Sequence, residues 1–528
     1  MDLDEILLEI GEFGRYQKLI LWLILLPSVF PCGFHAYNQL FMAAKPDHWC
    51  RVPELKNLTT DLAKNLSIPQ EEKDGIQHFS QCSMFNQNYS TDNLVSYTNK
   101  TISCQNGWIY DKSVYKNSVI TEWDLVCEKG LAPTLALVIF GIAGLIGNYI
   151  FGYVQDGLGR KSAFYIYLFI QTVFGFATAF ANNFYIWLLF RFGVAIELVG
   201  PKYRVTVTIL LNIAYSLSLI TLSIIVWAVR DWRMLAVVTT SPFLLIFCCY
   251  CIMPESPRWL LSQKKYEKAY KILRVMARVN KKTSKLTVSN LKKAIEDENA
   301  EITNQKQFGV LDLFRSPKLR LKTIIITFIW FTNTSVYVGL SYYAPGLGGD
   351  EFLNFFLAGA AELPTYLFLW PAMERCGRRS ILCVTMIVGG FACLATFMTK
   401  SHSTITLVLY CIGKMGISSA FVVLPLIASE IYPTVVRGIG ISISSVAGML
   451  GPVFIPLINH LGAHALTLPL MIMGVLSIAG GICSMLLPET LNRRLPQTLE
   501  DGEKEGLVRF SCGFSRASNS NIEKIEEK

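Results

Sequence analysis

Long apolar segments separated by short charged stretches make up most of this chain. Twelve such segments are present: Leu19–Ala43, Ala132–Tyr153, Ala163–Ala181, Phe184–Val199, Val205–Val229, Met234–Met253, Leu321–Tyr343, Phe352–Met373, Ile381–Thr399, Ile405–Ala428, Gly438–Leu461 and Leu466–Leu487. A helix needs about 20 mostly apolar residues to cross the hydrocarbon core of a bilayer. The pattern therefore predicts an all-α membrane protein with twelve transmembrane helices.

Composition agrees with a lipid bilayer as the main surroundings. Of the 528 residues, 52% are hydrophobic and only 16% are charged, which is fewer charges than a soluble domain carries. The net charge of +9 comes from loops between apolar segments, so we expect no nucleic acid partner. Asp2, Asp4 and Glu5 stand where a cleavable signal would be basic, so the first helix is expected to remain as an anchor.

The long loop Lys45–Gly130 has the features of an extracellular segment. It contains four glycosylation sequons, at Asn57, Asn65, Asn88 and Asn99, and four cysteines, Cys50, Cys82, Cys104 and Cys127. Sequons and cysteines gathered in one loop favour glycosylation and two disulfides in an oxidising compartment. Four cysteines allow three pairings, and free thiols are the alternative. The loop also offers a surface for homo-oligomer formation.

Basic residues gather in the short loops on the other side, which predicts that this side is cytoplasmic. They are Arg160, Lys161, Lys202, Arg204, Arg375, Arg378, Arg379 and Arg437. The expected order is a cytoplasmic N-terminus (1–18), an N-terminal half (19–253), a cytoplasmic loop (254–320), a C-terminal half (321–487) and a cytoplasmic tail (488–528). In the cytoplasmic loop, apolar spacing predicts an amphipathic helix over Lys264–Val279 and a second helix over Val288–Glu301. The tail beyond Pro496 is expected to be disordered.

The two halves repeat each other. Asp156-Gly-Leu-Gly-Arg-Lys follows the second segment, and Glu374-Arg-Cys-Gly-Arg-Arg follows the eighth. Similar pairs follow the fourth and tenth segments, and the sixth and twelfth, which is the plan of two six-helix halves. Acids and bases at these helix ends can form a conformational latch. Its predicted members are Asp156, Gly159, Arg160, Glu197, Arg204, Glu255, Arg258, Glu374, Arg378, Glu430 and Arg437.

Three motifs resemble one transporter family. They are Pro254-Glu-Ser-Pro-Arg-Trp-Leu260 and, at the two ends of the long loop, Pro46-Asp-His-Trp-Cys50 and Thr121-Glu-Trp-Asp-Leu-Val-Cys127. The first is similar to a motif shared by sugar porters and organic ion transporters. The two loop motifs are similar to the organic cation/anion/carnitine transporter family of the major facilitator superfamily, and the match covers about Phe13–Pro496. Ser335–Pro364 is most similar to the cation and carnitine branch. The resemblance implies a plasma-membrane carrier with a large extracellular loop between helices 1 and 2. Such a carrier moves small organic cations or carnitine-like zwitterions by alternating access.

Ionisable residues inside membrane helices are costly and often functional. Glu362, in the eighth segment, is predicted to attract a cationic substrate, and Lys414, in the tenth, either joins it at the site or forms a structural ion pair with it. Aromatic faces can bind cations, which makes Trp330, Tyr337 and, less strongly, Tyr37 and Tyr343 candidates. Asn38 and Asn212 are polar candidates, whereas His35 is expected to be a packed histidine. Family members that carry cations have an aspartate in helix 11, and many others an arginine, where this chain has Met449, so the preferred substrate charge stays open.

The sequence contains few signs of catalysis or of cofactor binding. We find no Walker A sequence, no catalytic constellation and no metal-ligand spacing. We therefore expect no enzyme activity, no ATP use, no metal and no cofactor. The alternatives are an organic anion transporter and a non-transporting surface glycoprotein of the same fold; a sugar porter ranks below them.

The fourth segment is short when the two halves are aligned. The offset between matching residues is 218 at Asp156 and Glu374, but 233 at Glu197 and Glu430. The first half therefore lacks 15 residues between Asp156 and Glu197. Helix 4 is expected to be abnormally short, or to begin early by using the turn before it. The origin is a splice form, an annotation gap or a real feature. We expect poor transport, and we expect that inserting about 15 apolar helical residues between Ile196 and Glu197 improves surface stability.

Overall fold

The computed structural model describes residues 10, 14–73, 76–87, 89, 100–195, 205–251, 253–282, 287–292, 309–399, 402–463, 467–491, 493 and 495–504.

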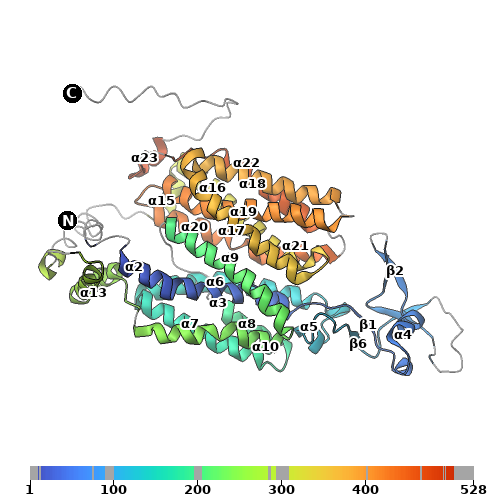
Figure 1. Ribbon diagram of the computed structural model, residues 1–528. Helices are drawn as coiled ribbons and strands as arrows, with labels where there is room; N and C mark the ends of the chain where they lie inside the picture. Colours follow the sequence, from blue (N-terminus) through green and yellow to red (C-terminus); the bar gives the residue numbers. More distant parts are fainter. Residues whose placement is uncertain are drawn as a thin grey trace.

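The described helices form two bundles that lie side by side (Figure 1). The N half contains α2 (Arg15–Ile20), the π-helix η1 (Leu21–Leu25), α3 (Leu26–Met42), α6 (Ala132–Leu158), α7 (Arg160–Ala179), α8 (Phe184–Ala195), α9 (Val205–Val229), α10 (Trp232–Thr240), α11 (Pro242–Phe247) and η4 (Cys248–Cys251). The C half contains α16 (Pro317–Tyr343), η5 (Ala344–Leu347), α17 (Glu351–Cys376), α18 (Arg378–Ala395), η6 (Thr396–Thr399), α19 (Ser403–Ile431), α20 (Arg437–Gly448), α21 (Gly451–His460), η7 (Leu461–Ala463) and α22 (Leu468–Ser484).

Ten helical stretches within the described residues are long and apolar enough to cross a membrane. The other two predicted segments appear as shorter apolar helices, Phe184–Ala195 and Leu468–Ser484. The predicted plan of twelve helices in two halves is therefore confirmed.

Two predicted helices are interrupted. The sixth is divided at Ser241, just before Pro242, and the eleventh at Met449 and Leu450, just before Gly451 and Pro452. Proline has no N–H to donate to the preceding turn, so it is tolerated at the start of a new helix. The eleventh helix can bend closely against α16 here, since a Cβ at Gly451 would lie 2.1 Å from the Ser335 Oγ atom.

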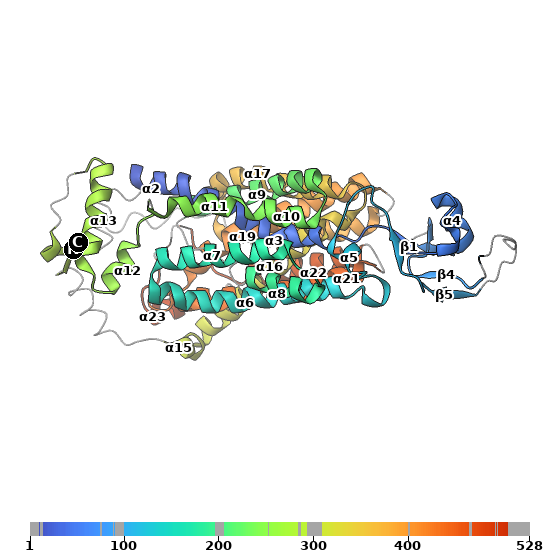
Figure 2. The ribbon, with the colours of Figure 1, turned by 90° about the horizontal axis from the view of Figure 1, so that it is seen from below.

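The long loop folds at one end of the bundle, which we call the loop end (Figure 2). It adds η2 (Pro53–Leu55), α4 (Thr60–Ser67), α5 (Val119–Glu122), η3 (Cys127–Lys129) and three two-stranded antiparallel sheets: β1 (His48–Cys50) with β6 (Trp108–Tyr110), β2 (Gln70–Lys73) with β3 (Ile76–Phe79), and β4 (Ser83–Phe85) with β5 (Thr101–Ser103). These strands were not predicted. The disulfides are Cys50–Cys104 and Cys82–Cys127, which selects one of the three possible pairings.

An ion pair fixes the base of this loop to the N half. Arg233 bonds to the Glu122 carboxylate and also donates to the carbonyls of Ala179 and Ala181. Burial would raise the pKa of Glu122, but hydrogen bonds from Arg233, Trp232 and Asn117 outweigh it and hold that pKa below its ordinary value. The loop is therefore tied to the ends of two helices of its own half.

The opposite end, which we call the motif end, carries α12 (Pro257–Ser262), α13 (Tyr266–Val279), α15 (Val310–Arg315) and α23 (Leu499–Lys504). The amphipathic helix expected over Lys264–Val279 is present as α13, which buries Ala269, Leu273 and Met276. Residues 288–292 are helical, and the rest of the second expected helix lies outside the described residues.

The expectation that the whole tail beyond Pro496 is disordered was wrong for its first residues. Buried Lys322 donates to the Gly502 carbonyl at 3.0 Å, and the Thr434 N–H donates to the Pro496 carbonyl at 3.0 Å. A buried ammonium needs acceptors, and this segment supplies one. Composition alone did not reveal the acceptor, because it is a backbone oxygen.

Contacts between the two halves gather toward the loop end. The Tyr115 hydroxyl donates to Glu351 at 2.6 Å, and Ser223 donates to the Phe352 carbonyl at 2.6 Å. The Thr134 Oγ1 and His460 Nδ1 atoms are 3.3 Å apart. These residues belong to different halves, so the halves are in contact at the loop end in this conformation.

Candidate functional site

A buried acid and a buried base form an ion pair between neighbouring helices of the C half. Glu362 lies midway along α17 and Lys414 lies midway along α19; their side chains are 0% and 1% exposed. The Lys414 Nζ atom is 3.1 Å from the Glu362 Oε1 atom. An isolated buried charge is very costly, whereas a paired and hydrogen-bonded one is tolerated. The sequence indicated both residues, and the structure brings them together.

Helix α16 completes the surroundings of the lysine. The Lys414 ammonium donates to Ser341 and, at 3.3 Å, to the Tyr337 carbonyl. It also lies 3.5 Å from the centroid of the Tyr337 ring. The ammonium thus has a carboxylate, an aromatic face and two further oxygens around it.

The Glu362 carboxylate is reached from both halves. Ser216, on α9 of the N half, donates to its Oε2 atom. The hydroxyls of Tyr337 and Tyr366 donate to the same oxygen at 3.5 and 3.3 Å. Glu362 therefore lies where the two halves meet, which is where substrates bind in transporters built from two repeats.

Aromatic rings from both halves lie on the loop-end side of this pair. The Tyr37 ring of α3 packs edge-on against the rings of Tyr342 and Phe355, with ring centroids 5.7 and 5.9 Å apart. Tyr215, on α9, approaches Tyr37 at 6.5 Å. The faces of such rings, which carry the negative end of the ring quadrupole, attract cationic groups.

The other predicted site residues lie around the Glu362–Lys414 pair or farther from it. Trp330 is two turns along α16 from Tyr337, and both contact the Phe421 ring, at 6.2 and 5.2 Å. Asn38 is buried but donates to Thr239 inside the N half at 3.0 Å. Asn212 is half-buried on α9. Among the predicted residues, Tyr337 and Lys414 are in direct contact with Glu362.

Three more sequence interpretations concern single residues. His35 is packed, with its ring stacked on Phe243 at 5.4 Å. Tyr343 lines a cavity of about 230 Å³ near the loop end, away from Glu362. Met449, the position at which the family resemblance implied a charged residue, lies at the break between α20 and α21.

Helix α8 also contains a buried cation. It begins at Phe184, after Asn183, whose side chain accepts from the Ile186 N–H at 2.9 Å. The helix therefore does not use the preceding turn. Arg191 is 1% exposed; it donates to Gln39 at 3.0 Å and to the His35 carbonyl at 3.1 Å. Ile196–Arg204, and with them Glu197, lie outside the described residues, so the length of this helix stays a prediction.

Comparisons with known proteins identify the family. The model of the family described as "Sugar (and other) transporter" matches residues 95–501. The chain is 51% identical to a "Beta-alanine transporter" of Drosophila melanogaster, over 97% of this chain and 91% of the relative. It is 32% identical to the human "Organic cation/carnitine transporter 2", over 94% and 93%.

The chain belongs to this transporter family.

Within the family, its relatives are the organic cation and carnitine transporters, as the motifs predicted. A "Carcinine transporter" of Drosophila melanogaster is 41% identical, over 96% of this chain and 79% of the relative. The fold agrees with a solved structure of the xylose transporter XylE from E. coli, with a TM-score of 0.56 at 15% identity, over 90% of this chain and 99% of that one. The alignment with the β-alanine transporter extends over 556 residues although this chain has 528. That relative therefore has residues which this transporter lacks.

At the motif end, the repeat seen in the sequence is a repeat in space. Gly159 and Gly377 have φ angles of +96° and +84°, a region in which other residues are strained. A Cβ at Gly159 would lie 2.6 Å from Glu255, and one at Gly377 would lie 2.7 Å from Glu489. These carboxylates accept the backbone N–H groups of Lys161 and Arg378 at 3.0 and 2.9 Å.

Two ion pairs between described residues of this end each join helices of one half. Arg378 pairs with Glu430 at 3.1 Å, and exposed Arg160 pairs with Asp156 at 3.4 Å. Arg437 donates to the Tyr432 carbonyl and to Thr434. In this conformation the described pairs therefore hold each half together, and a latch that opens during transport stays a prediction.

The remaining predicted latch members contribute less to this picture. Glu374 and Arg258 are both exposed. Glu197 and Arg204 lie outside the described residues.

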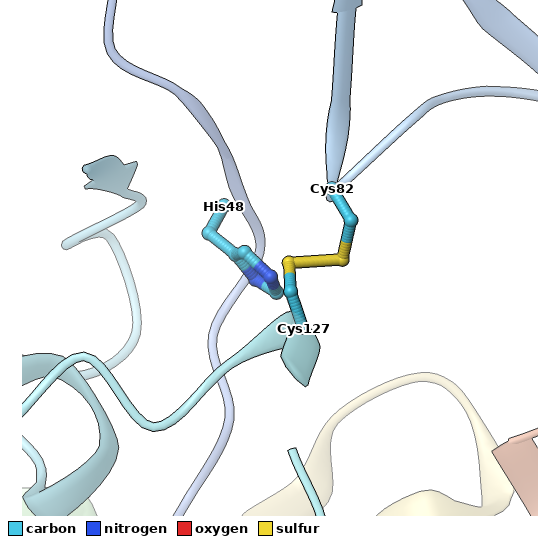
Figure 3. A group of neighbouring side chains, drawn as sticks. All are labelled: His48, Cys82 and Cys127. Carbon is cyan, nitrogen blue, oxygen red and sulfur yellow. A yellow bond between two sulfur atoms is a disulfide. The ribbon is translucent and has the colours of Figure 1, made fainter. Parts of the chain in front are cut away.

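One group in the loop resembles a metal site in composition. Ligand atoms of His48, Cys82 and Cys127 lie within 4.8 Å of one another (Figure 3). The two sulfurs are bonded to each other as a disulfide, and metals bind the thiolate form of cysteine. The oxidised loop therefore has no thiolates to offer at this position.

Several residues of the site escaped the sequence analysis. Ser216, Ser341 and Tyr366 carry hydroxyl groups that contact the ion pair, but hydroxyls are common in membrane helices. Glu489 occupies the position in the second half that matches Glu255 in the first. The repeat therefore offered a signal that Glu489 belongs with the predicted latch residues. The serines had no such signal.

Proposed function

We propose that the chain is a plasma-membrane carrier that moves small organic cations or zwitterions by alternating access. The observation that carries this proposal is the fully buried Glu362–Lys414 pair at the meeting point of the halves. Buried ionisable groups in a bundle are expensive to keep. Recognition of a charged solute is a reason to keep them.

The loop end is assigned to the cell exterior. Two disulfides fit an oxidising compartment, and the sequons at Asn57 and Asn65 are exposed. Asn88 and Asn99 lie outside the described residues. Enzymatic deglycosylation of the protein from the cell surface should increase its gel mobility; unchanged mobility would count against this orientation.

Alternating access requires the contacts between the halves to change. Tyr115–Glu351, Ser223–Phe352 and the aromatic contacts of Tyr37 join the two halves on the loop-end side of Glu362, across the route that a solute from that end would take. Rocking of one half against the other would open that route. The acids and bases at the motif end then serve as the latch, with each half moving as one body.

The relatives support this substrate range. They include proteins named for β-alanine, carcinine and carnitine. β-Alanine and carnitine each carry one positive and one negative group, as the site does.

The test is uptake per surface molecule for Glu362→Gln. A panel of labelled β-alanine, carnitine, tetraethylammonium and an organic anion should show loss of the amine substrates, by about tenfold or more, because a neutral amide replaces the charge. Glu267→Gln removes an exposed carboxylate from α13 and is the matched control. Unchanged amine uptake at equal surface level would refute the role of Glu362.

A second candidate function is favoured by the shortened first half. A surface glycoprotein that no longer transports would keep the long loop and the fold but would not complete the transport cycle. Absence of uptake for the whole panel, in a chain delivered normally to the surface, would select this candidate.

A further inference from the structure

The Lys414 ammonium already occupies the kind of site that a substrate amine needs. It has the Glu362 carboxylate at 3.1 Å, the Tyr337 ring at 3.5 Å and the Tyr337 carbonyl at 3.3 Å. A substrate ammonium would bind best to the same carboxylate and the same ring face. Both cations cannot hold the same oxygen and ring face at once.

We propose that Lys414 is an internal stand-in for the substrate's ammonium, which displaces it from Glu362, and that the freed lysine then binds the substrate's carboxylate. This inference rests on the proposed function, because it assumes that Glu362 is the substrate site. It adds the substrate class, namely small zwitterions whose charges are separated by a short chain, and a role in specificity for Lys414.

Charge balance in the buried site supports this class. The pair has no net charge, and both side chains are almost fully buried. A zwitterion that inserts between them replaces one ion pair by two and leaves the site neutral. A simple cation would leave the displaced lysine without a counter-charge, and an uncompensated buried charge is strongly unfavourable.

The lysine can make this move. Its flexible four-carbon stem bears a compact ammonium that can change acceptors, whereas Tyr337 and Ser341 are on the adjacent helix α16 and remain available to whichever cation is present. In the empty carrier the lysine would return to Glu362, so that an unpaired carboxylate need not be buried.

A purely structural ion pair would behave differently on substitution. If the pair only stabilises the bundle, Lys414→Gln should weaken the binding of all ligands together. If Lys414 is the stand-in, the same change removes a competitor of simple cations and, at the same time, the partner of the zwitterion's carboxylate. The two ligand classes should then respond in opposite directions.

The experiment is equilibrium binding to the purified full-length chain, which does not require a complete transport cycle. The probes are labelled tetraethylammonium and labelled β-alanine. Lys414→Gln should bind tetraethylammonium about tenfold more tightly, since the competent state is no longer occupied by the lysine, and β-alanine about tenfold more weakly. Lys414→Arg, which keeps the charge, should stay near the original ratio of the two affinities.

Two controls keep the outcomes separate. Lys322→Gln removes another buried lysine, on α16 at the motif end, and should leave the ratio unchanged. If Lys414→Gln does not fold, the double variant Glu362→Gln/Lys414→Gln, which strands no charge, should have lost both ligands, while Lys414→Arg should retain both.

The results discriminate between the two proposals. Equal weakening of both ligands in Lys414→Gln, or a double variant that still binds β-alanine as the original chain does, would overturn the stand-in role but leave Glu362 as a site to be tested by uptake. Failure of the original chain to bind either probe would overturn the proposed function as well.

Discussion

Helices α8 and α19 occupy equivalent places in the two halves but differ in chemistry and in the sequence spacing that follows their buried cation. Arg191-Phe-Gly-Val in α8 matches Lys414-Met-Gly-Ile in α19, so each helix carries one buried cation followed by glycine. α19 has 29 residues, whereas α8 has 12 within the described part of the chain. The repeat therefore preserved the position of the buried cation.

The partners of the two cations differ as well. Glu362 lies twelve positions before Glu374, and the residue twelve positions before Asp156 is Gly144. Lys414 thus faces a carboxylate, whereas Arg191 bonds to an amide and a backbone carbonyl. One fold can therefore place a charged pair in one half alone, and this asymmetry localises the proposed site in the C half.

The largest effect should come from lengthening the short helix. Sixteen positions separate Lys414 from Glu430, but only six separate Arg191 from Glu197. Ten apolar, helix-forming residues inserted between Ile196 and Glu197 would add about 15 Å of helix and should raise uptake per surface molecule several-fold. The same insertion between Lys281 and Lys282 is the control. Equal uptake with and without the insert before Glu197 would show that the first half is not deficient.

Removal of the two cations should affect stability unequally. Lys414→Gln strands the Glu362 carboxylate and should cost about 3–5 kcal/mol, whereas Arg191→Gln loses hydrogen bonds to neutral groups and should cost about 1–3 kcal/mol. Thermal unfolding of the purified variants measures the difference. The reverse order would indicate that Arg191 has an acidic partner of its own.

The motif end should respond symmetrically. Gly159→Ala and Gly377→Ala each place a Cβ against a glutamate in a backbone region with positive φ. Each change should lower stability by about 1–2 kcal/mol from the backbone alone, with an added cost from the contact. The thermal unfolding temperatures of the two variants should fall together. A large difference would mean that the two halves are not equivalent at this end.

The smallest expected effect concerns the long loop, which only the N half carries. Burial is the main cause that lowers the pKa of His48 below its ordinary value. Below about pH 6.5, His48 therefore binds a proton more readily in the unfolded loop than in the folded loop. The folded loop should lose stability, on the order of 1 kcal/mol, as the pH falls through this range. Proteolysis of the loop at pH 7.4 and pH 5.5 measures this loss. His48→Gln should weaken the pH dependence, whereas His78→Gln, at an exposed position, should not.

The sequence by itself determined the class of the protein, the number of helices and the residues that pair in the C half. Long apolar segments have few alternatives to membrane helices, because the bilayer leaves no other partner for their backbone groups. Within those segments, Glu362 and Lys414 stood out, since charges are rare there. The repeated Gly-Arg loops and the helix α13 were likewise local patterns, and local patterns can be read from the chain.

The tertiary structure decided what depends on distance between segments. It selected the pairing of the four loop cysteines, placed Ser216 of the N half on Glu362, and put the tail at Gly502 beside Lys322. Serine hydroxyls and backbone carbonyls occur all along the chain, so no local pattern marks the few that meet a buried charge. Their role follows only from folding, because a buried charge is stabilised by whichever polar atoms the packing of distant helices brings within hydrogen-bond distance.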